Sequence, residues 1–190
     1  MRYDTRMSPT EKLTAFLRAQ APAPVPHRGK DDPRPAIAAK LALAEGRPAV
    51  HELLATLVER DTSFALFDIE LYPALLARAP WEQGVMSERE ICVAKNGAGD
   101  LYLWNVDDDS VRLVVHDEGW ASHDKGRSFD EFLEEALGTC LELLLADELD
   151  ELDEARRARV RFAVDTVGAT RLDAEVRARL VAHGVIARRP

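Results

Sequence analysis

Apolar side chains recur at helical spacing over much of the chain, and the clearest run follows Ser128. Its i, i+3, i+4 series comprises Phe129, Phe132, Leu133, Ala136, Leu137, Cys140, Leu141, Leu144 and Leu145. Ser128 and Glu131 have the spacing of a capping box, which predicts that this helix begins there. Shorter patterns of the same kind predict further helices within residues 1–20, 36–45, 48–60, 151–167 and 171–183.

Residues 90–116 have the shorter period that is typical of β-strands. Three apolar or alternating runs lie there, over residues 91–94, 101–106 and 111–116. Asn96-Gly97 indicates a hairpin turn between the first two, because both residues tolerate a positive φ. The pattern predicts an antiparallel meander of three strands, and its apolar faces need helices on at least one side.

Two other stretches complete the expected organisation. Residues 63–76 predict a short strand over Phe64–Phe67 and then a turn of helix capped by Asp68. Residues 21–35 hold five of the ten prolines, and proline fixes φ and removes an amide donor. They predict an extended linker, so residues 1–35 are expected to form an N-terminal helix and arm before the main body.

The net charge of −9 is distributed unevenly along the chain. Residues 1–99 carry 13 basic and 13 acidic side chains, residues 100–154 carry 3 and 18, and residues 155–190 carry 9 and 3. The middle segment repels phosphate backbones, which disfavours nucleic acid as a partner, and it attracts a basic surface. Simple solubility is the alternative interpretation. The Arg-rich tail can bind phosphate or pair with the acidic segment before it.

Several classes of protein are disfavoured. No apolar run approaches the roughly 18 residues of a membrane span, and the N-terminus leads into no apolar signal region. Cys92 and Cys140 form no C-x-x-C pair, which argues against a disulfide scaffold or a zinc ribbon and makes the cytoplasm the expected location. The two helices within residues 36–60 carry balanced charges, which disfavours a DNA-binding helix-turn-helix.

The histidines offer the main candidate for metal chemistry. His116 and His123 flank Asp117, Glu118 and Asp124, a spacing compatible with a metal site. The alternative is that these are polar residues of a strand end and its loop. No H-E-x-x-H motif occurs in the chain.

Other candidate sites fail on their surroundings. The carboxylates of residues 147–154 lack the glycine of an EF-hand loop. Asn96-Gly97-Ala98-Gly99 joins two predicted strands, whereas a phosphate loop leads into a helix N-terminus. Cys140 lies on the apolar face of its helix, which favours a buried structural thiol over a nucleophile. We therefore expect no catalytic site and no cofactor.

The segment from Ile91 to Trp104 resembles the signature hairpin of the SUKH superfamily. That hairpin consists of a strand, a G-x-G-D-like turn and an aromatic-rich strand. In this sequence the pattern falls on Gly97, Gly99, Asp100, Tyr102 and Trp104. A third strand, an acidic loop and His116 follow.

Two further segments extend the resemblance to residues 36–137. Ser128-Phe129-x-x-Phe132-Leu133 resembles the start of the family's closing helix, and Phe64-Ala65-Leu66-Phe67 resembles the strand before its variable loop. The family's Asn-Gly element after its early helices is not evident near residues 54–64. The proline-rich arm and the helices of residues 138–190 lie outside the pattern and form an N-terminal arm and a C-terminal extension.

The resemblance implies an α+β fold with a central, mainly antiparallel sheet flanked by helices, here with extra C-terminal helices. Many bacterial members of the family are immunity proteins that neutralise a cognate toxin, often a nuclease, and fungal members regulate cell-wall synthesis. An acidic protein can steer onto a basic nuclease and cover its site. The expected partner is therefore a toxin with a basic surface, and this chain needs no catalysis of its own.

The candidate partner contacts are acidic residues of the predicted loops and two aromatic residues. They are Asp107, Asp108, Asp109, Asp117, Glu118 and Asp124, with Trp104 and Trp120 as aromatic anchors. Core packing is the alternative for Trp104, and for Trp120 the two interpretations are balanced. Two other functions stay open, an intracellular scaffold or regulator that docks through its extra helices and a metal-dependent hydrolase that uses His116 and His123.

Overall fold

Six antiparallel strands form one sheet in which every strand lies beside its neighbour in the chain. They are β1 Phe64–Leu66, β2 Ile69–Leu71, β3 Glu90–Lys95, β4 Leu101–Asn105, β5 Val111–Val115 and β6 Ala121–Gly126. The structure is a computed structural model that describes residues 6–20, 33–78, 85–144 and 146–187. The expected α+β fold with a central antiparallel sheet is therefore confirmed.

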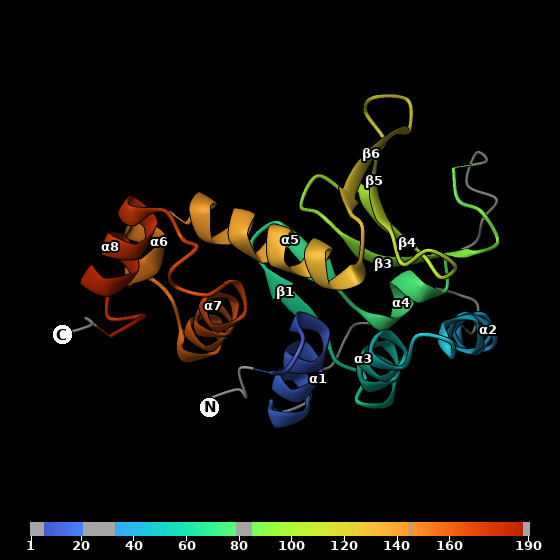
Figure 1. The fold of residues 1–190 in the computed structure, drawn as a ribbon, viewed down its shortest axis with the longest axis horizontal. Coiled ribbons are helices and arrows are strands. Elements are labelled where there is room, and N and C mark those ends of the chain that lie inside the picture. The colour runs from blue at the N-terminus through green and yellow to red at the C-terminus, as the bar shows by residue number, and fades with distance from the viewer. Residues whose placement is uncertain (1–5, 21–32, 79–84, 145, 188–190) are drawn as a thin grey trace.

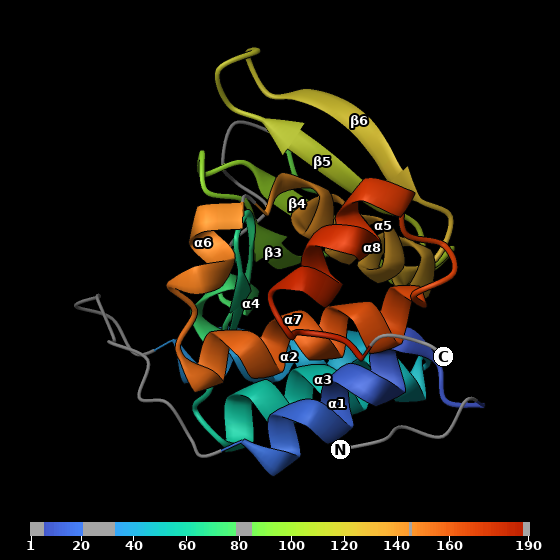
Figure 2. The same ribbon diagram turned by 90° about the vertical axis from the view of Figure 1, so that its left-hand side faces the viewer.

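Helices from both ends of the chain pack on this sheet. The described helices are α1 Pro9–Ala19, α2 Arg34–Ala44, α3 Pro48–Glu59, α4 Pro73–Leu76, α5 Phe129–Leu143, α6 Ala146–Asp150, α7 Glu154–Val167 and α8 Ala174–Ala182. Of these, α4, α5 and α7 make the main contacts with the strands. Helix α5 crosses one face of the sheet, α1 and α7 pack against α5, and α3 packs against α1 (Figure 1). The β5–β6 hairpin rises beyond this helical layer (Figure 2).

One hydrophobic core joins the N-terminal helix, the sheet and the C-terminal helices. Phe16 of α1, Phe64 of β1 and Phe162 of α7 meet with ring centroids 4.8–6.0 Å apart. All three side chains are buried. Burying a Phe side chain contributes roughly 1.5–3 kcal/mol, so these contacts tie residues before and after the predicted main body into the same core.

A second, smaller apolar cluster covers the other face of the central strands. Side chains on a strand alternate between the two faces, so Tyr102 and Trp104 of β4 pack towards α5 while their neighbours point away. The cluster on the far side comprises Leu75, Met86, Cys92, Leu101, Leu103 and Val114. Both faces of the central strands are therefore covered, which agrees with the mixed apolar pattern of residues 90–116.

The prediction for residues 63–76 was wrong in detail. Instead of one strand and a capped helix, the segment forms the β1–β2 hairpin, with Leu66 paired to Ile69. Phe67 lies in the turn with a φ of 46° and is exposed, and Asp68 accepts a 2.8 Å hydrogen bond from the Gly97 amide. Helix α4 begins only at Pro73. The apolar pattern marked an extended segment but could not reveal the tight turn within it.

The meander has a fourth strand that the hydrophobic pattern did not predict. Strand β6 pairs with β5, with Leu113 opposite His123 and Val115 opposite Ala121. Its sequence, Ala-Ser-His-Asp-Lys-Gly, has no apolar alternation, because it is an edge strand whose middle residues are exposed. Backbone pairing with β5 therefore stabilises this strand more than side-chain burial does.

The predicted helix ends are mostly correct. Ser128 caps α5 by accepting a 3.1 Å hydrogen bond from the Glu131 amide, although the Glu131 carboxylate accepts from the Arg127 amide rather than from Ser128. Helix α7 ends at Val167 and is followed by the predicted Gly168, whose φ is 86°. The predicted cap of α8 at Thr170 was wrong, because Asp173 accepts from the Glu175 amide instead.

Candidate functional site

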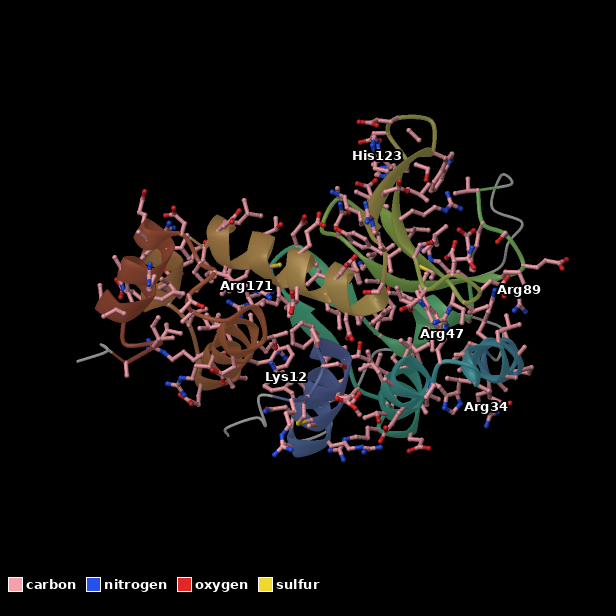
Figure 3. All side chains as sticks on the ribbon, in the orientation of Figure 1. Lys12, Arg34, Arg47, Arg89, His123 and Arg171 are labelled. Atoms are coloured by element: carbon pink, nitrogen blue, oxygen red, sulfur yellow. The ribbon has the colours of Figure 1, made fainter. Side chains whose placement is uncertain are left out.

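The candidate contact residues lie at opposite ends of β5. Asp107, Asp108 and Asp109 form the β4–β5 turn, whereas Asp117, Glu118 and Trp120 form the β5–β6 turn at the other end. Figure 3 shows Arg47 and Arg89 beside the first end and His123 on the projecting hairpin. The structure therefore does not unite the six acidic residues in one patch, and each turn has to be judged by its own contacts.

In the β4–β5 turn, every aspartate side chain is engaged within the protein. Arg89 donates to both Asp107 carboxylate oxygens at 2.5–3.1 Å. Asp108 accepts from the amide and the hydroxyl of Ser110 at 3.0 and 2.7 Å. These hydrogen bonds lower the pKa of both carboxyl groups, from Arg89 for Asp107 and from Ser110 for Asp108. The turn thus uses its carboxylates to hold its own shape.

The third aspartate of this turn is tied to the core through Trp104. The Trp104 indole N–H donates a 2.8 Å hydrogen bond to Asp109, which has a φ of 68°. The indole ring is fully buried and packs edge-on against Phe129. Trp104 therefore serves the core, and its side chain is not exposed to a partner as the aromatic-anchor hypothesis requires.

The Gly-Asp hairpin connects to the base of the other turn. Asp100 is buried and accepts from the Asn96 side chain at 2.9 Å, from the His116 amide at 3.0 Å and from His116 Nδ1 at 2.7 Å. Burial by itself raises the pKa of Asp100, but the hydrogen bonds from Asn96 and His116 outweigh it and hold the pKa below its ordinary value. Of the hairpin's glycines, Gly99 takes the positive φ, at 96°.

The β5–β6 turn presents its carboxylates differently. Asp117 and Glu118 are exposed, and their neighbours are His116 Nε2 at 3.0 Å and His123 Nε2 at 2.9 Å. Gly119 and Trp120 have φ values of 66° and 68°, which reverse the chain sharply. In the described parts of the chain, no Lys or Arg forms a salt bridge with either carboxylate. This end of the sheet therefore retains its negative charge.

Trp120 lies at the base of this turn and is half-buried. Its ring packs against the second apolar cluster and has its centroid 6.2 Å from that of His116. Because the side chain covers the end of the sheet and is also partly exposed, both interpretations of Trp120 apply to part of its surface.

Asp124 is placed on an element that the sequence did not predict. It lies on β6 opposite Arg112. The Arg112 guanidinium turns instead to Glu90, at 2.6 and 2.8 Å, and to the Ser122 hydroxyl at 3.2 Å. Burial by itself raises the pKa of Glu90, but the hydrogen bonds from Arg112 and Ser87 have the larger effect. The pKa of Glu90 is therefore below its ordinary value. Among the described residues, Asp124 has no salt bridge and is exposed.

The metal-ligating and thiol side chains of the described residues are poorly placed for metal binding or for thiol chemistry. Among them there is no group of three or more His, Cys, Asp or Glu side chains that could hold a metal ion. Cys140 donates to the Leu66 carbonyl at 3.1 Å, and burial raises the pKa of its thiol to about 11. Cys92 is also buried. Cys140 thus has the properties of a structural side chain.

The Arg-rich C-terminal segment folds back on the acidic part of the chain. Arg171 pairs with Glu134 of α5 at 2.5 Å, and Arg179 donates to the Leu144 carbonyl. Arg161 pairs with Glu154 at 3.2 Å. These contacts agree with the interpretation in which the basic tail compensates part of the acidic segment.

Protein-family models, curated proteins and solved structures were compared with this chain, and none of them matches it. In the part of the chain that the structure describes, no helix combines the length and apolar character that crossing a membrane requires. The function is therefore inferred from the geometry and the charge of the site.

Proposed function

We propose that this protein is an immunity-type binding protein that neutralises a basic bacterial toxin by protein–protein contact, without catalysis of its own. The observation that supports the proposal is the charge of the β5–β6 hairpin. Asp117, Glu118 and Asp124 are exposed on it, and no described Lys or Arg neutralises them through a salt bridge. The resemblance of the Gly97–Asp100 hairpin to the SUKH signature supports the same function.

The physical basis is competition for cationic side chains. A nuclease holds the phosphates of its substrate with Lys and Arg, and carboxylates on an inhibitor can occupy the same positions. Complementary charge also accelerates association by steering the two proteins together. The hairpin suits this role because it extends beyond the helices (Figure 2), so it can approach a recessed site without a clash of the protein body.

This interpretation narrows the candidate contacts. The β4–β5 turn is the weaker half of the candidate surface, because Asp107 is already paired with Arg89 and Asp109 holds the Trp104 indole. A cation from a partner would have to displace these bonds. We therefore assign the contact to Asp117, Glu118 and Asp124, with the exposed part of Trp120 beside them.

The test is a rescue experiment with the neighbouring gene product. The C-terminal domain of the protein encoded immediately upstream is expressed in bacteria with and without this chain. We expect the domain to arrest growth alone and the full chain to restore it. Failure to protect, or a neighbour that is not toxic, would refute the proposal.

A charge-matched comparison locates the contact. The combined variant Asp117→Asn, Glu118→Gln, Asp124→Asn is compared with a control that removes three exposed carboxylates within or at the end of helices, Glu45→Gln, Glu59→Gln, Glu142→Gln. Both lose the same net charge. We expect the hairpin variant to slow association about tenfold at low salt and the control to change it less than twofold, because steering depends on charges near the contact. Equal effects would point to net charge alone.

A further inference from the structure

The outer edge of β6 differs from the other edge of the sheet. Strand β1, at the opposite edge, has only three residues, and helix α7 packs against it, whereas helix α5 contacts β6 near Lys125 and Gly126. Strand β6 has six residues and pairs only with β5 among the described strands. Figure 2 shows it as the outermost strand of the projecting hairpin. An edge strand carries backbone N–H and C=O groups that can pair with another extended chain.

The charges along β6 favour one kind of strand at this edge. Two cations beside Asp124 are directed towards other carboxylates, the cross-strand Arg112 to Glu90 at 2.6 Å and the adjacent Lys125 to Glu135 of α5 at 3.8 Å. Asp124 has no such partner among the described residues. An added strand that carries Lys or Arg can place a cation beside Asp124, whereas an acidic strand meets like charge.

The strand is also held in place at both ends. At Gly126 a Cβ atom would lie 2.8 Å from the Phe132 nitrogen and 3.0 Å from the Ser128 carbonyl, so the end of β6 fits closely against the start of α5. At the other end the Trp120 amide donates to Val115 at 2.9 Å, and the Trp120 ring packs on the second cluster. A strand held in this way loses little conformational entropy when another strand pairs with it.

We propose that the basic toxin binds by strand addition. An extended basic segment of the toxin pairs with the outer edge of β6 and places a Lys or Arg beside Asp124. The inference rests on the proposed function and specifies how the toxin contacts this protein. Main-chain hydrogen bonds then provide affinity, and the carboxylates of the hairpin select a basic sequence. A second copy of this chain is a poorer occupant, because its own β6 brings another Asp124 to the edge.

The experiment is amide hydrogen exchange on the full chain, alone and in complex with the C-terminal domain of the protein encoded upstream. We expect exchange within residues 121–126 to slow at least tenfold in the complex, with no such change in the β1–β2 hairpin. Asp124→Asn should weaken affinity about fivefold, and the exposed helical control Glu142→Gln less than twofold.

The outcomes separate the two proposals. If no complex forms, the proposed function fails and strand addition fails with it. If a tight complex forms but exchange in β6 is unchanged, the partner binds elsewhere and only strand addition is refuted. Exchange in β6 that slows with increasing concentration of this chain alone would identify a second copy as the occupant and would also overturn the inference.

Discussion

Replacing Asp100 tests whether the Gly-Asp hairpin acts as a structural lock between β4 and the end of β5. In Asp100→Ala the side chain of Asn96 and both the amide and Nδ1 of His116 lose their acceptor. A hydrogen bond to a charged group contributes about 1.5–3 kcal/mol, and bonds that share one acceptor are not additive. We expect a total loss of about 3 kcal/mol, a large share of the roughly 5–15 kcal/mol typical of a folded domain.

Asp100→Asn provides a graded comparison. Its carbonyl oxygen can still accept from His116, but its amide group meets the Asn96 side-chain amide, which donates to Asp100 in the wild type. We therefore expect an intermediate loss of about 1–2 kcal/mol. The exposed helical variant Glu142→Ala should stay within about 0.5 kcal/mol of wild type.

Urea unfolding followed by circular dichroism measures these differences, and their pH dependence tests their origin. The pKa of Asp100 is lower in the folded protein than its ordinary value of 3.8. Its stabilisation is therefore complete above that value and declines as the pH falls through the lower, folded-state pKa. The gap between wild type and Asp100→Ala should shrink as the pH is lowered from about 5 towards about 2. A loss below about 0.5 kcal/mol at pH near 7, or a gap that does not change with pH, would refute the lock.

Three other predictions concern the core and its connections. Asp109→Ala should destabilise the fold by about 1–2 kcal/mol, because it leaves the Trp104 indole N–H without its acceptor. A change in urea midpoint no larger than that of Glu142→Ala would show that this hydrogen bond does not stabilise the fold. Phe162→Ala should cost about 3–5 kcal/mol in thermal or urea unfolding, since its ring is buried between those of α1 and β1, and a loss below about 1 kcal/mol would show that this contact is loose. Cys140 should react with a thiol reagent only after unfolding, because it is buried and its pKa is about 11; rapid labelling of the native protein near pH 8 would contradict its burial.

The two turns of the meander show where sequence patterns stop being informative. Asp107-Asp108-Asp109 and Asp117-Glu118 are similarly acidic in the sequence, and both were candidate contacts. Only the fold brings Arg89 to Asp107 and the Trp104 indole to Asp109, while it leaves the second pair beside histidines. The sequence separation between Arg89 and Asp107 hides this pairing, because it depends on how β3 and β4 align.

Strand β6 illustrates the opposite case, a structural element that lacks a sequence signal. Hydrophobic periodicity detects strands that bury one face, and residues 121–126 bury little. A polar stretch after a turn was the only available indication, and it favours a loop equally well. Asp124 is exposed, but its place on an edge strand rather than in a loop could not be predicted.

The sequence by itself determined the elements that depend on local patterns. The helix capped by Ser128 and the hairpin between β3 and β4 follow from the capping residues, the turn residues and the apolar spacing, although the positive φ of this turn falls at Gly99 rather than at Asn96 or Gly97. The α+β class was an expectation from the family resemblance, and the sheet with its helices confirms it. The uneven charge of the chain was also evident from the sequence. Tertiary structure decided which carboxylates are already paired, that Trp104 belongs to the core and that β6 forms the outer edge of the sheet. These features depend on contacts between residues whose distance in space is set by packing rather than by local pattern.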